Sequence, residues 1–293
     1  MTVLTMPEVI GTIDELRNRV GETRDSAAMV GGDTRVVLVP TMGALHEGHL
    51  ALIRRARQLG DIVVVSIFVN PLQFGVNEDL DRYPRTFAAD LQALAAEDVT
   101  FVFAPSAHEM YPEPSNGTRV TAGPIASLLE GASRPGHFDG MLTVVAKLLN
   151  IVTPDTAVFG QKDAQQVFLA QSMVTDLNVR VAIDVVPTVR EASGLALSSR
   201  NRNLNEAQLH AAAALYAGLT SAQSAAAGGS VAALAAAHAL IDPQPLVKLD
   251  YLVVVHPHTF LPVGAEHVGP ARMLVAALVG GTRLIDNVSL DVA

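Results

Sequence analysis

Two histidines three residues apart mark the first segment that could do chemistry, residues 40–49 (PTMGALHEGH). His46 and His49 fall on the first turn of a predicted helix, where this spacing puts both rings on one face. A helix N-terminus offers free amides and a positive dipole to a phosphate, and Gly48 leaves room for a nucleotide beside the backbone. Taken alone, the pair is equally well explained by helix capping. A zinc-protease motif is excluded, because it needs histidines four residues apart with Glu between them.

A second polar segment, residues 159–166 (FGQKDAQQ), lies at another predicted strand-to-helix turn. Lys162 is placed to bind phosphate, and Gln166 follows four residues later on the same helix face. Asp163 could accept a hydrogen bond from a ribose hydroxyl. For Asp at this position taken alone, however, a helix cap is the commoner role.

A third segment, residues 197–201 (LSSRN), combines two hydroxyls with a guanidinium. Ser198, Ser199 and Arg200 suit the oxygens of a polyphosphate, which Arg can bind in bidentate fashion. On its own, Ser-Ser-Arg is more often structural, so this segment counts only in combination with the other two.

Two weaker clusters and an acidic group complete the candidates. Asn70 and Gln73 follow the second predicted strand, and residues 134–140 (RPGHFDG) open a helix that they could simply cap. Most acidic runs are solvated, but one member of the acidic group could reach Mg²⁺ through water. Its members are Glu78, Asp79, Asp81 and Asp90.

Alternating strands and helices must position these residues. Apolar runs predict strands at 35–40, 61–69, 100–104, 156–159 and 179–186. Helical spacing predicts a helix from about Ile10 to Val20 and others at 46–59, 86–97, 137–152 and 163–176. The pattern predicts an α/β fold with a Rossmann-like, doubly wound parallel sheet, which binds its ligands beyond the carboxyl ends of the strands.

The character of the chain changes after Pro187. Alanine-rich helices are predicted at 205–227 and 231–241, followed by strands at 248–255, 273–279 and 283–291. We therefore expect two domains, 1–187 and 188–293, of which the second is a smaller α+β domain, with the boundary near 187–195.

Composition excludes several classes of protein. The 293 residues contain no cysteine, which excludes a disulfide framework, an iron–sulfur site and a thiol nucleophile. A net charge of −9 with only 20 basic residues argues against a nucleic-acid partner. No run of about 20 apolar residues predicts a membrane span. The N-terminus lacks the basic region of a signal peptide, so we expect a cytoplasmic protein.

Together these segments resemble the pantoate–β-alanine ligase family of the HxGH nucleotidyltransferase superfamily. The resemblance runs from residue 39 to 287, and its most specific stretches are PTMGALHEGH, FGQKD and SSRN in this order. The other matching stretches are SIFVNPLQFG, DRYPRT, RPGHFDG, PTVREASGLAL and RLIDN.

The resemblance implies an ATP-dependent ligation in two steps. The carboxylate of pantoate attacks the α-phosphorus of ATP, which gives pantoyl adenylate and pyrophosphate. The amine of β-alanine then attacks the acyl carbon, which gives pantothenate and AMP. Such chemistry needs mainly positioning and charge neutralisation. The family also implies a homodimer whose second domain closes as a lid.

The resemblance also implies a role for each matching residue. Expected catalytic residues are His46, His49, Lys162, Ser198, Ser199 and Arg200. Expected ATP-binding residues are Met42, Gly48, Gly160, Lys162, Asp163, Leu197, Ser198, Ser199 and Arg200. Met42, Asn70, Gln73 and Gln166 are expected to bind pantoate, and Asp90 to help place Mg²⁺.

The chain departs from the family pattern at a few positions. Ala164 and Asn203 stand where the family has tyrosine, and Leu197 where methionine is common. We expect the two missing tyrosines to loosen the phosphate side of the site, so that restoring them improves the kinetics with ATP unless the core has repacked.

Two alternative functions remain open on the sequence. One is another HxGH nucleotidyltransferase that stops after joining a nucleotide to a phosphate ester. The other is a non-catalytic nucleotide-binding paralogue that acts as a sensor or scaffold. The amide-rich turns at Gln73 and Gln166 favour a small polar carboxylate as substrate. The joint presence of His46, His49, Lys162 and Arg200 argues against a non-catalytic paralogue.

Overall fold

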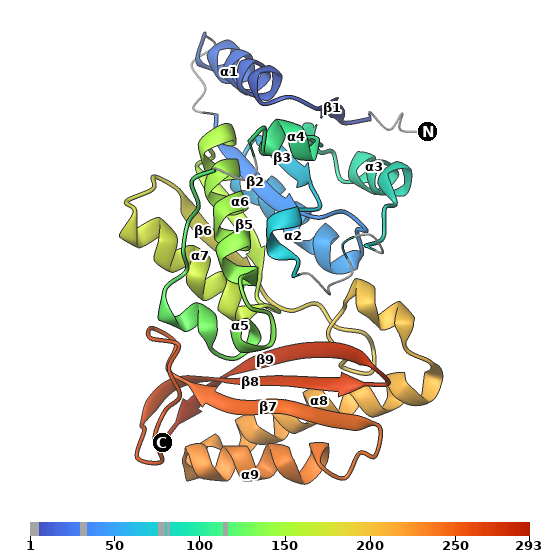
Figure 1. Ribbon diagram of the computed structural model, residues 1–293, viewed down its shortest axis with the longest axis vertical. Helices are drawn as coiled ribbons and strands as arrows, with labels where there is room; N and C mark the ends of the chain where they lie inside the picture. The colour runs from blue at the N-terminus through green and yellow to red at the C-terminus, as the bar shows by residue number, and fades with distance from the viewer. Residues whose placement is uncertain (1–5, 30–33, 76–79, 81–82, 114–116) are drawn as a thin grey trace. The chain divides into compact units, whose positions relative to one another are not determined.

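The computed structural model describes residues 6–29, 34–75, 80, 83–113 and 117–293, which form two compact units (Figure 1). The first unit comprises Met1–Gly160 and Leu169–Val186. The second comprises Gln161–Phe168 and Pro187–Ala293. The chain therefore enters the second unit briefly, directly after a strand of the first.

The first unit is built on a six-stranded parallel sheet in the order β1-β4-β3-β2-β5-β6. Its strands are β1 (Glu8–Ile10), β2 (Val36–Thr41), β3 (Ile62–Ile67), β4 (Phe101–Phe103), β5 (Thr156–Gly160) and β6 (Ala182–Val186). The central strand β2 pairs with β3 on one side and β5 on the other, so that Leu38 lies opposite both Val64 and Ala157. The chain order reverses at β2, which creates the switch point where open α/β sheets bind ligands.

Helices cover both faces of this sheet, as the apolar strands require (Figure 1). Leu52 and Ile53 of α2 and Leu94 of α3 pack on one face, against a core that includes Val39 and Val65. On the other face α6 packs against β2, and α1 packs against α6. The helices are α1 (Ile13–Met29), α2 (Glu47–Leu59), α3 (Phe87–Ala96), α4 (Ala107–Met110), α5 (Glu130–Ser133), α6 (His137–Val152) and α7 (Ala164–Asp176), with short 3₁₀ helices η1 (Pro71–Gln73) and η2 (Pro124–Ser127). The predicted α/β fold class is confirmed.

The predicted helix from Ile10 to Val20 is wrong at its start. Residues Glu8–Ile10 form an edge strand, because Ile10 pairs with Phe103 of β4 and is fully buried there. The helix begins only at Ile13 and extends to Met29. Ile10 fits the helical spacing by coincidence, and pairing with a distant strand decides its conformation.

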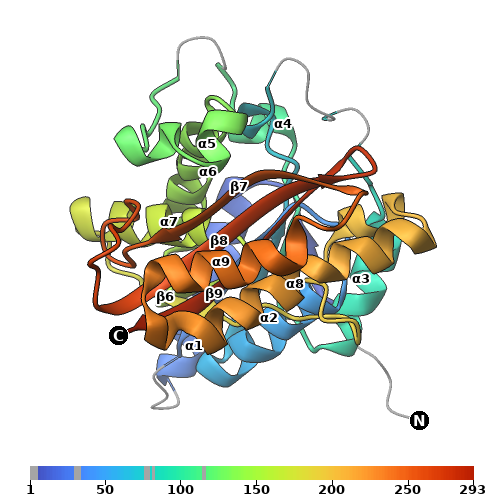
Figure 2. The ribbon, with the colours of Figure 1, turned by 90° about the horizontal axis from the view of Figure 1, so that it is seen from below.

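The second unit packs two helices on one face of a three-stranded antiparallel sheet. Its elements are η3 (Ser199–Asn203), α8 (Glu206–Ala225), η4 (Ala226–Gly228), α9 (Ser230–Ile241), β7 (Val247–Val255), β8 (Gly269–Val279) and β9 (Thr282–Val292). Helices α8 and α9 lie side by side (Figure 2), and Leu215, Leu219 and Ala237 share a core with Met273 and Val275 of β8. Small side chains permit this close packing, since a Cβ at Gly218 would lie 2.8 Å from the side chain of Ile241.

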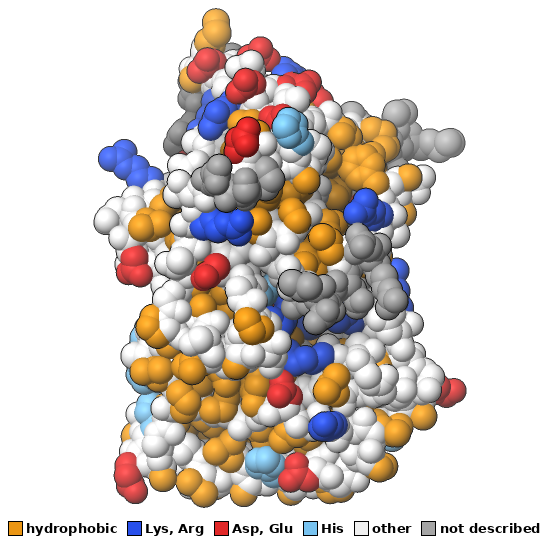
Figure 3. Space-filling model, in the orientation of Figure 1, with side chains coloured by type: hydrophobic (Ala, Val, Ile, Leu, Met, Phe, Trp, Pro, Cys, Tyr) orange, Lys and Arg blue, Asp and Glu red, His pale blue; other side chains and the backbone are white. Residues whose placement is uncertain are grey.

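Hydrophobic side chains gather over β7 and β8 on the face that Figure 3 shows. Leu261 and Val268, in the loop that joins these two strands, are among the exposed hydrophobic residues. Within the part of the chain that the structure describes, no helix is both long and apolar enough to span a bilayer.

Candidate active site

The loop between β2 and α2 carries the first candidate residues in a constrained backbone. Gly43 and Ala44 both have a left-handed φ, of 79° and 51°. A side chain at Gly43 would be strained by this φ, and its Cβ would lie 3.1 Å from Oδ2 of Asp90. The loop therefore needs glycine at this position and an external partner to hold it.

Asp90, on α3, is that partner. Its Oδ2 accepts a hydrogen bond from the amide of Ala44 at 3.0 Å, and its Oδ1 accepts from the amide of Leu45 at 2.9 Å and from the Thr86 hydroxyl at 3.1 Å. The side chain is buried, with 3% exposure. Asp90 thus fixes the backbone that leads into His46, a role that the sequence did not predict.

The expected help of Asp90 in placing Mg²⁺ stays a prediction, and in this structure both of its oxygens accept hydrogen bonds from protein groups. Among the residues that the structure describes, no group of three or more His, Asp or Glu side chains could hold a metal ion. The other acidic candidates Glu78, Asp79 and Asp81 lie outside the described residues.

His46 and His49 cap α2 reciprocally. Nδ1 of His46 accepts from the amide of Gly48 at 3.1 Å, and Nδ1 of His49 accepts from the amide of His46 at 3.3 Å. The ring centroids lie 4.1 Å apart. The capping interpretation of the two histidines is therefore correct, and the rings are held together at a helix N-terminus.

Capping fixes the chemistry of the second nitrogen in each ring. A neutral imidazole whose Nδ1 accepts a hydrogen bond carries its hydrogen on Nε2. Phosphate binding would therefore have to use Nε2, so capping by Nδ1 does not exclude it.

Three of the four residues expected to bind pantoate come together in the first unit. Gln73, on η1, directs its Nε2 at Sδ of Met42, 3.1 Å away, and its Oε1 accepts from Nδ2 of Asn70 at 3.1 Å. Gln73 is also anchored through its backbone, because its carbonyl lies 2.9 Å from Nδ1 of His137. Gly140 allows this turn to sit on α6, since a Cβ there would lie 2.1 Å from the carbonyl oxygen of Leu72.

Asn70 itself is saturated with hydrogen bonds. Its Nδ2 donates to Gln73 and to the carbonyl of Gly140 at 3.0 Å, and its Oδ1 accepts from the amide of Leu72 at 3.3 Å and from the Tyr111 hydroxyl at 2.9 Å. A substrate contact would have to replace one of these four bonds. The sequence did not point to Tyr111, because no local pattern links it to Asn70. Burial raises the pKa of the Tyr111 hydroxyl to about 12.

Lys162 of the second unit follows β5 and precedes α7. Burial, and after it the positive charge of Arg200, lowers the pKa of Lys162 to about 8, while Asp286 and Asp163 oppose the shift. Oδ1 of Asp163 accepts from the amide of Gln166 at 3.1 Å, so Asp163 caps α7, as expected for an Asp at this position.

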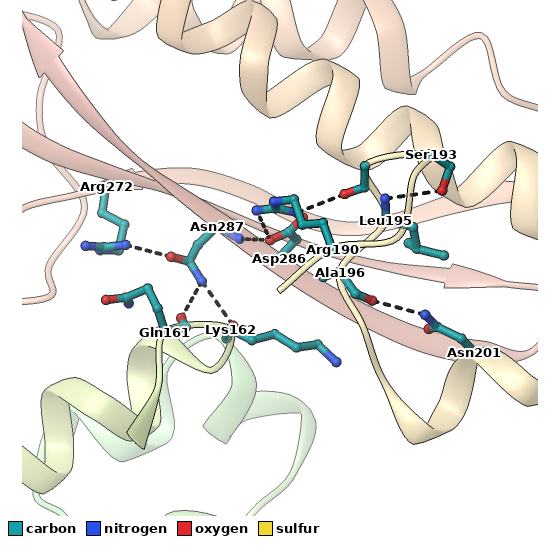
Figure 4. Close-up of polar contacts among 11 residues, drawn as sticks. Gln161, Lys162, Arg190, Ser193, Leu195, Ala196, Asn201, Arg272, Asp286 and Asn287 are labelled. Atoms are coloured by element: carbon teal, nitrogen blue, oxygen red, sulfur yellow. Dashed lines mark hydrogen bonds and ion pairs between the residues drawn. The ribbon is translucent and has the colours of Figure 1, made fainter. Parts of the chain in front are cut away.

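Ser198 caps the start of η3, and Arg200 lies in the first turn of this helix. Oγ of Ser198 accepts from the amide of Arg200 at 3.2 Å, and the side chain of Arg200 is exposed. Asn201, which follows, is buried and donates to Oε1 of Glu191 at 2.8 Å and to the carbonyl of Ala196 at 3.1 Å. These two bonds, the second of which appears in Figure 4, tie the LSSRN segment to the preceding loop.

The remaining candidates occupy ordinary positions in the two units. Gly160 ends β5, where an added Cβ would make only an ordinary contact, 3.8 Å from Leu52. Gly48 uses its amide to bond His46. Leu197 and Ser199 are partly exposed. The described contacts of these four residues assign none of them a ligand.

Comparison with known proteins adds an independent line of evidence. The family model described as Pantoate-beta-alanine ligase matches residues 8–289. A Leifsonia xyli protein described as pantothenate synthetase is 59% identical over 277 residues, which cover 93% of this chain and 96% of that protein.

Solved structures agree in fold as well as sequence. The crystal structure of pantothenate synthetase from Thermus thermophilus superposes with a TM-score of 0.87 at 44% identity, covering 96% of this chain and 98% of that one. That of pantoate–β-alanine ligase from Francisella tularensis, complexed with beta-gamma ATP and β-alanine, has a TM-score of 0.77 at 37% identity and covers 96% and 97% of the two chains.

Proposed function

Because the chain belongs to the pantoate–β-alanine ligase family, it is an AMP-forming ligase that makes pantothenate, and we propose a role for each of its site residues in that reaction. ATP is a substrate, and the reaction has two half-reactions. Oxygen of the pantoate carboxylate attacks the α-phosphorus of ATP and expels pyrophosphate. The amine of β-alanine then attacks the acyl carbon of the adenylate, expels AMP and loses a proton.

His46 and His49 donate from Nε2–H to the triphosphate during the first half-reaction. Support comes from their capping bonds at Nδ1, which set this tautomer and hold both rings at one helix N-terminus. Preorganised donors of this kind stabilise developing charge without reorganising at the moment of reaction.

Lys162 binds the phosphates as an ammonium, while Ser198, Ser199 and Arg200 receive the leaving pyrophosphate. The exposed guanidinium of Arg200 and the effect of its charge on Lys162 support this grouping within the second unit. Lys162 and Arg200 are both cations and repel each other. An anion such as pyrophosphate, bound between them, is attracted to both and offsets this repulsion.

Nucleotide and pantoate contacts complete the proposal. Gly48, Gly160, Asp163 and Leu197 shape the adenosine site, and Met42 borders both substrates. Gln73 and Gln166 bind pantoate through their side-chain amides. We assign Asn70 the positioning of Gln73 instead of direct contact with pantoate, since all four of its hydrogen-bonding positions are used.

Magnesium fits this site as a companion of the nucleotide. Mg²⁺ commonly binds through substrate phosphates and water with only one or two carboxylates, and the described residues form no acidic cluster that could hold it alone. When bound, it would neutralise phosphate charge. Asp90 remains a candidate for an outer, water-mediated contact.

The homodimer, the cytoplasmic location and the lid role of residues 188–293 stay predictions.

The observation that carries the proposal is the pair of histidines that cap α2, in a chain that belongs to a family that ligates pantoate with β-alanine. Product analysis with ATP, pantoate and β-alanine should give pantothenate, AMP and pyrophosphate in equal amounts. Isotope exchange between pyrophosphate and ATP should require pantoate but not β-alanine.

Each competing outcome points to a different mechanism or function. Exchange that strictly needs β-alanine would contradict the free adenylate. A stable nucleotide adduct of a phosphate ester would indicate another nucleotidyltransferase, and binding of ATP without any product would indicate a non-catalytic paralogue.

A further inference from the structure

Asn287 of β9 contacts the loop that carries Lys162, although 125 positions separate the two residues in sequence. Its Nδ2 donates to the carbonyl of Gln161 at 2.8 Å and to the carbonyl of Lys162 at 3.0 Å (Figure 4). The side chain is buried, with 3% exposure. One amide group therefore holds two consecutive carbonyls of the turn between β5 and α7.

We propose that Asn287 is a positioning residue for Lys162, acting by fixing the backbone from which the lysine side chain extends. The inference rests on the proposed role of Lys162 in binding phosphate. A lysine is a compact charge on a flexible four-carbon stem, so its placement depends on where its backbone is held. Misplacement by about 1 Å can cost roughly 10²-fold in rate.

The orientation of the Asn287 amide is itself determined. Nη1 of Arg272 donates to Oδ1 of Asn287 at 2.6 Å, so Oδ1 must face the guanidinium and Nδ2 must face the two carbonyls. Arg272 lies on the neighbouring strand, where Leu274 pairs with Asn287 in register. The amide thus has a donor partner on one side and acceptors on the other.

The residue before Asn287 anchors the same stretch of β9. Oδ1 of Asp286 accepts from the amide of Asn287 at 2.8 Å, and Arg190 binds both oxygens of Asp286 at 2.6 and 3.0 Å. The Arg190 guanidinium also lies 3.7 Å from the ring centroid of Tyr216. These contacts make the platform under Asn287 rigid, which a positioning role requires.

Charged groups from three elements face Lys162: Arg200 of η3, Asp286 of β9 and Asp163 of its own turn. Asn287 carries no charge and so holds the turn without changing the ionisation of Lys162 directly. Substituting it should change the rate of adenylation more than the pH at which that rate declines.

The test compares pyrophosphate–ATP exchange in the wild type, Asn287→Ala, Lys162→Ala and the double variant. We expect Asn287→Ala to slow exchange by about 10- to 100-fold. In the Lys162→Ala background the same substitution should change exchange by less than about threefold, because its effect passes through the lysine. Asn287→Asp keeps an acceptor for Arg272 but turns a carboxylate oxygen toward the two carbonyls, so it should also slow exchange. This variant replaces Asn287→Ala if Asn287→Ala does not fold.

Val288→Ala is the matched control for lost stability. Val288 neighbours Asn287 on β9, but its side chain is buried in the hydrophobic core of the second unit. We expect this variant to melt at a lower temperature, with an exchange rate within about twofold of the wild type. The exchange rates of all variants are measured well below their melting temperatures.

The outcomes separate the inference from the function on which it rests. Normal exchange in Lys162→Ala would overturn the role of Lys162 and the inference with it. A full effect of Asn287→Ala in the Lys162→Ala background, normal exchange in Asn287→Ala, or an equal loss in Val288→Ala would overturn the inference alone.

Discussion

Nδ1 of His49 accepts a hydrogen bond from the backbone amide of His46 at 3.3 Å, so the second histidine caps the turn that the first one opens. His46 completes the arrangement by accepting from the amide of Gly48 at 3.1 Å. Each ring is thereby oriented by its Nδ1, and the role that we propose for each ring uses its Nε2.

Asparagine and glutamine should separate the two functions of His46. His46→Asn offers an acceptor where Nδ1 was, and Asn is among the best helix N-caps, so we expect stability within about 0.5 kcal/mol of the wild type. The variant lacks the Nε2 donor, and its exchange rate should fall by about 10²–10³. His46→Gln should do the reverse and retain part of the rate with a weaker cap. Near-normal exchange in His46→Asn, measured beside its melting curve, would show that only the cap matters.

Replacing Asp90 should damage the loop before His46. The Asp90 carboxylate accepts hydrogen bonds from the backbone amides of Ala44 and Leu45. In Asp90→Asn the side-chain NH₂ must face one of these two N–H donors. We expect a loss of about 1–3 kcal/mol in urea unfolding and slower exchange. Asp98→Asn is the control, because that side chain is 75% exposed and should change stability by less than about 0.5 kcal/mol.

The same Asp90 variant distinguishes positioning from metal binding. If Asp90 positions the loop, the Mg²⁺ concentration that gives half-maximal rate should be unchanged in Asp90→Asn. A large increase in that concentration, in a variant of normal stability, would assign the carboxylate to the metal.

Activity should decline at alkaline pH as Lys162 loses its charge. The lysine is positive below its pKa of about 8 and neutral above it, so kcat/KM for ATP should fall as the pH rises through this value. The Arg200 guanidinium is one cause of the lowered pKa. Arg200→Gln should therefore slow the reaction yet move the alkaline decline to higher pH. A decline that stays in place, in pH–rate profiles of the two proteins, would mean that Lys162 is not the group that titrates.

Restoring the family tyrosines should have different effects at the two positions. Ala164 is only 6% exposed, so a tyrosine ring there must displace packed neighbours, and we expect a loss of roughly 1–3 kcal/mol. Asn203 is exposed, and Asn203→Tyr should change stability little. At Ala164 we therefore expect overpacking, which was the alternative to the gain in ATP kinetics that the sequence suggested. A stable Ala164→Tyr with a lower KM for ATP would restore the original expectation.

The sequence alone determined the features that depend on nearby residues. Apolar runs predicted the strands, helical spacing predicted α2 and α6, and the motif segments indicated the family that the comparisons confirm. Capping by His46 and His49 was also within reach, because the atoms involved lie within three residues of one another. Such signals are readable since backbone geometry fixes which near neighbours meet.

Tertiary structure alone decided which distant side chain holds each functional segment. Asp90 bonds Leu45 across 45 positions, Tyr111 bonds Asn70 across 41, and Asn287 bonds Lys162 across 125. The edge strand at Ile10 likewise exists because β4 lies beside it. These contacts follow from sheet order and side-chain packing, and a buried polar group takes whichever partner the fold brings within about 3 Å. No local pattern encodes that choice, so the sequence indicated the candidate site residues and the fold supplied their supports.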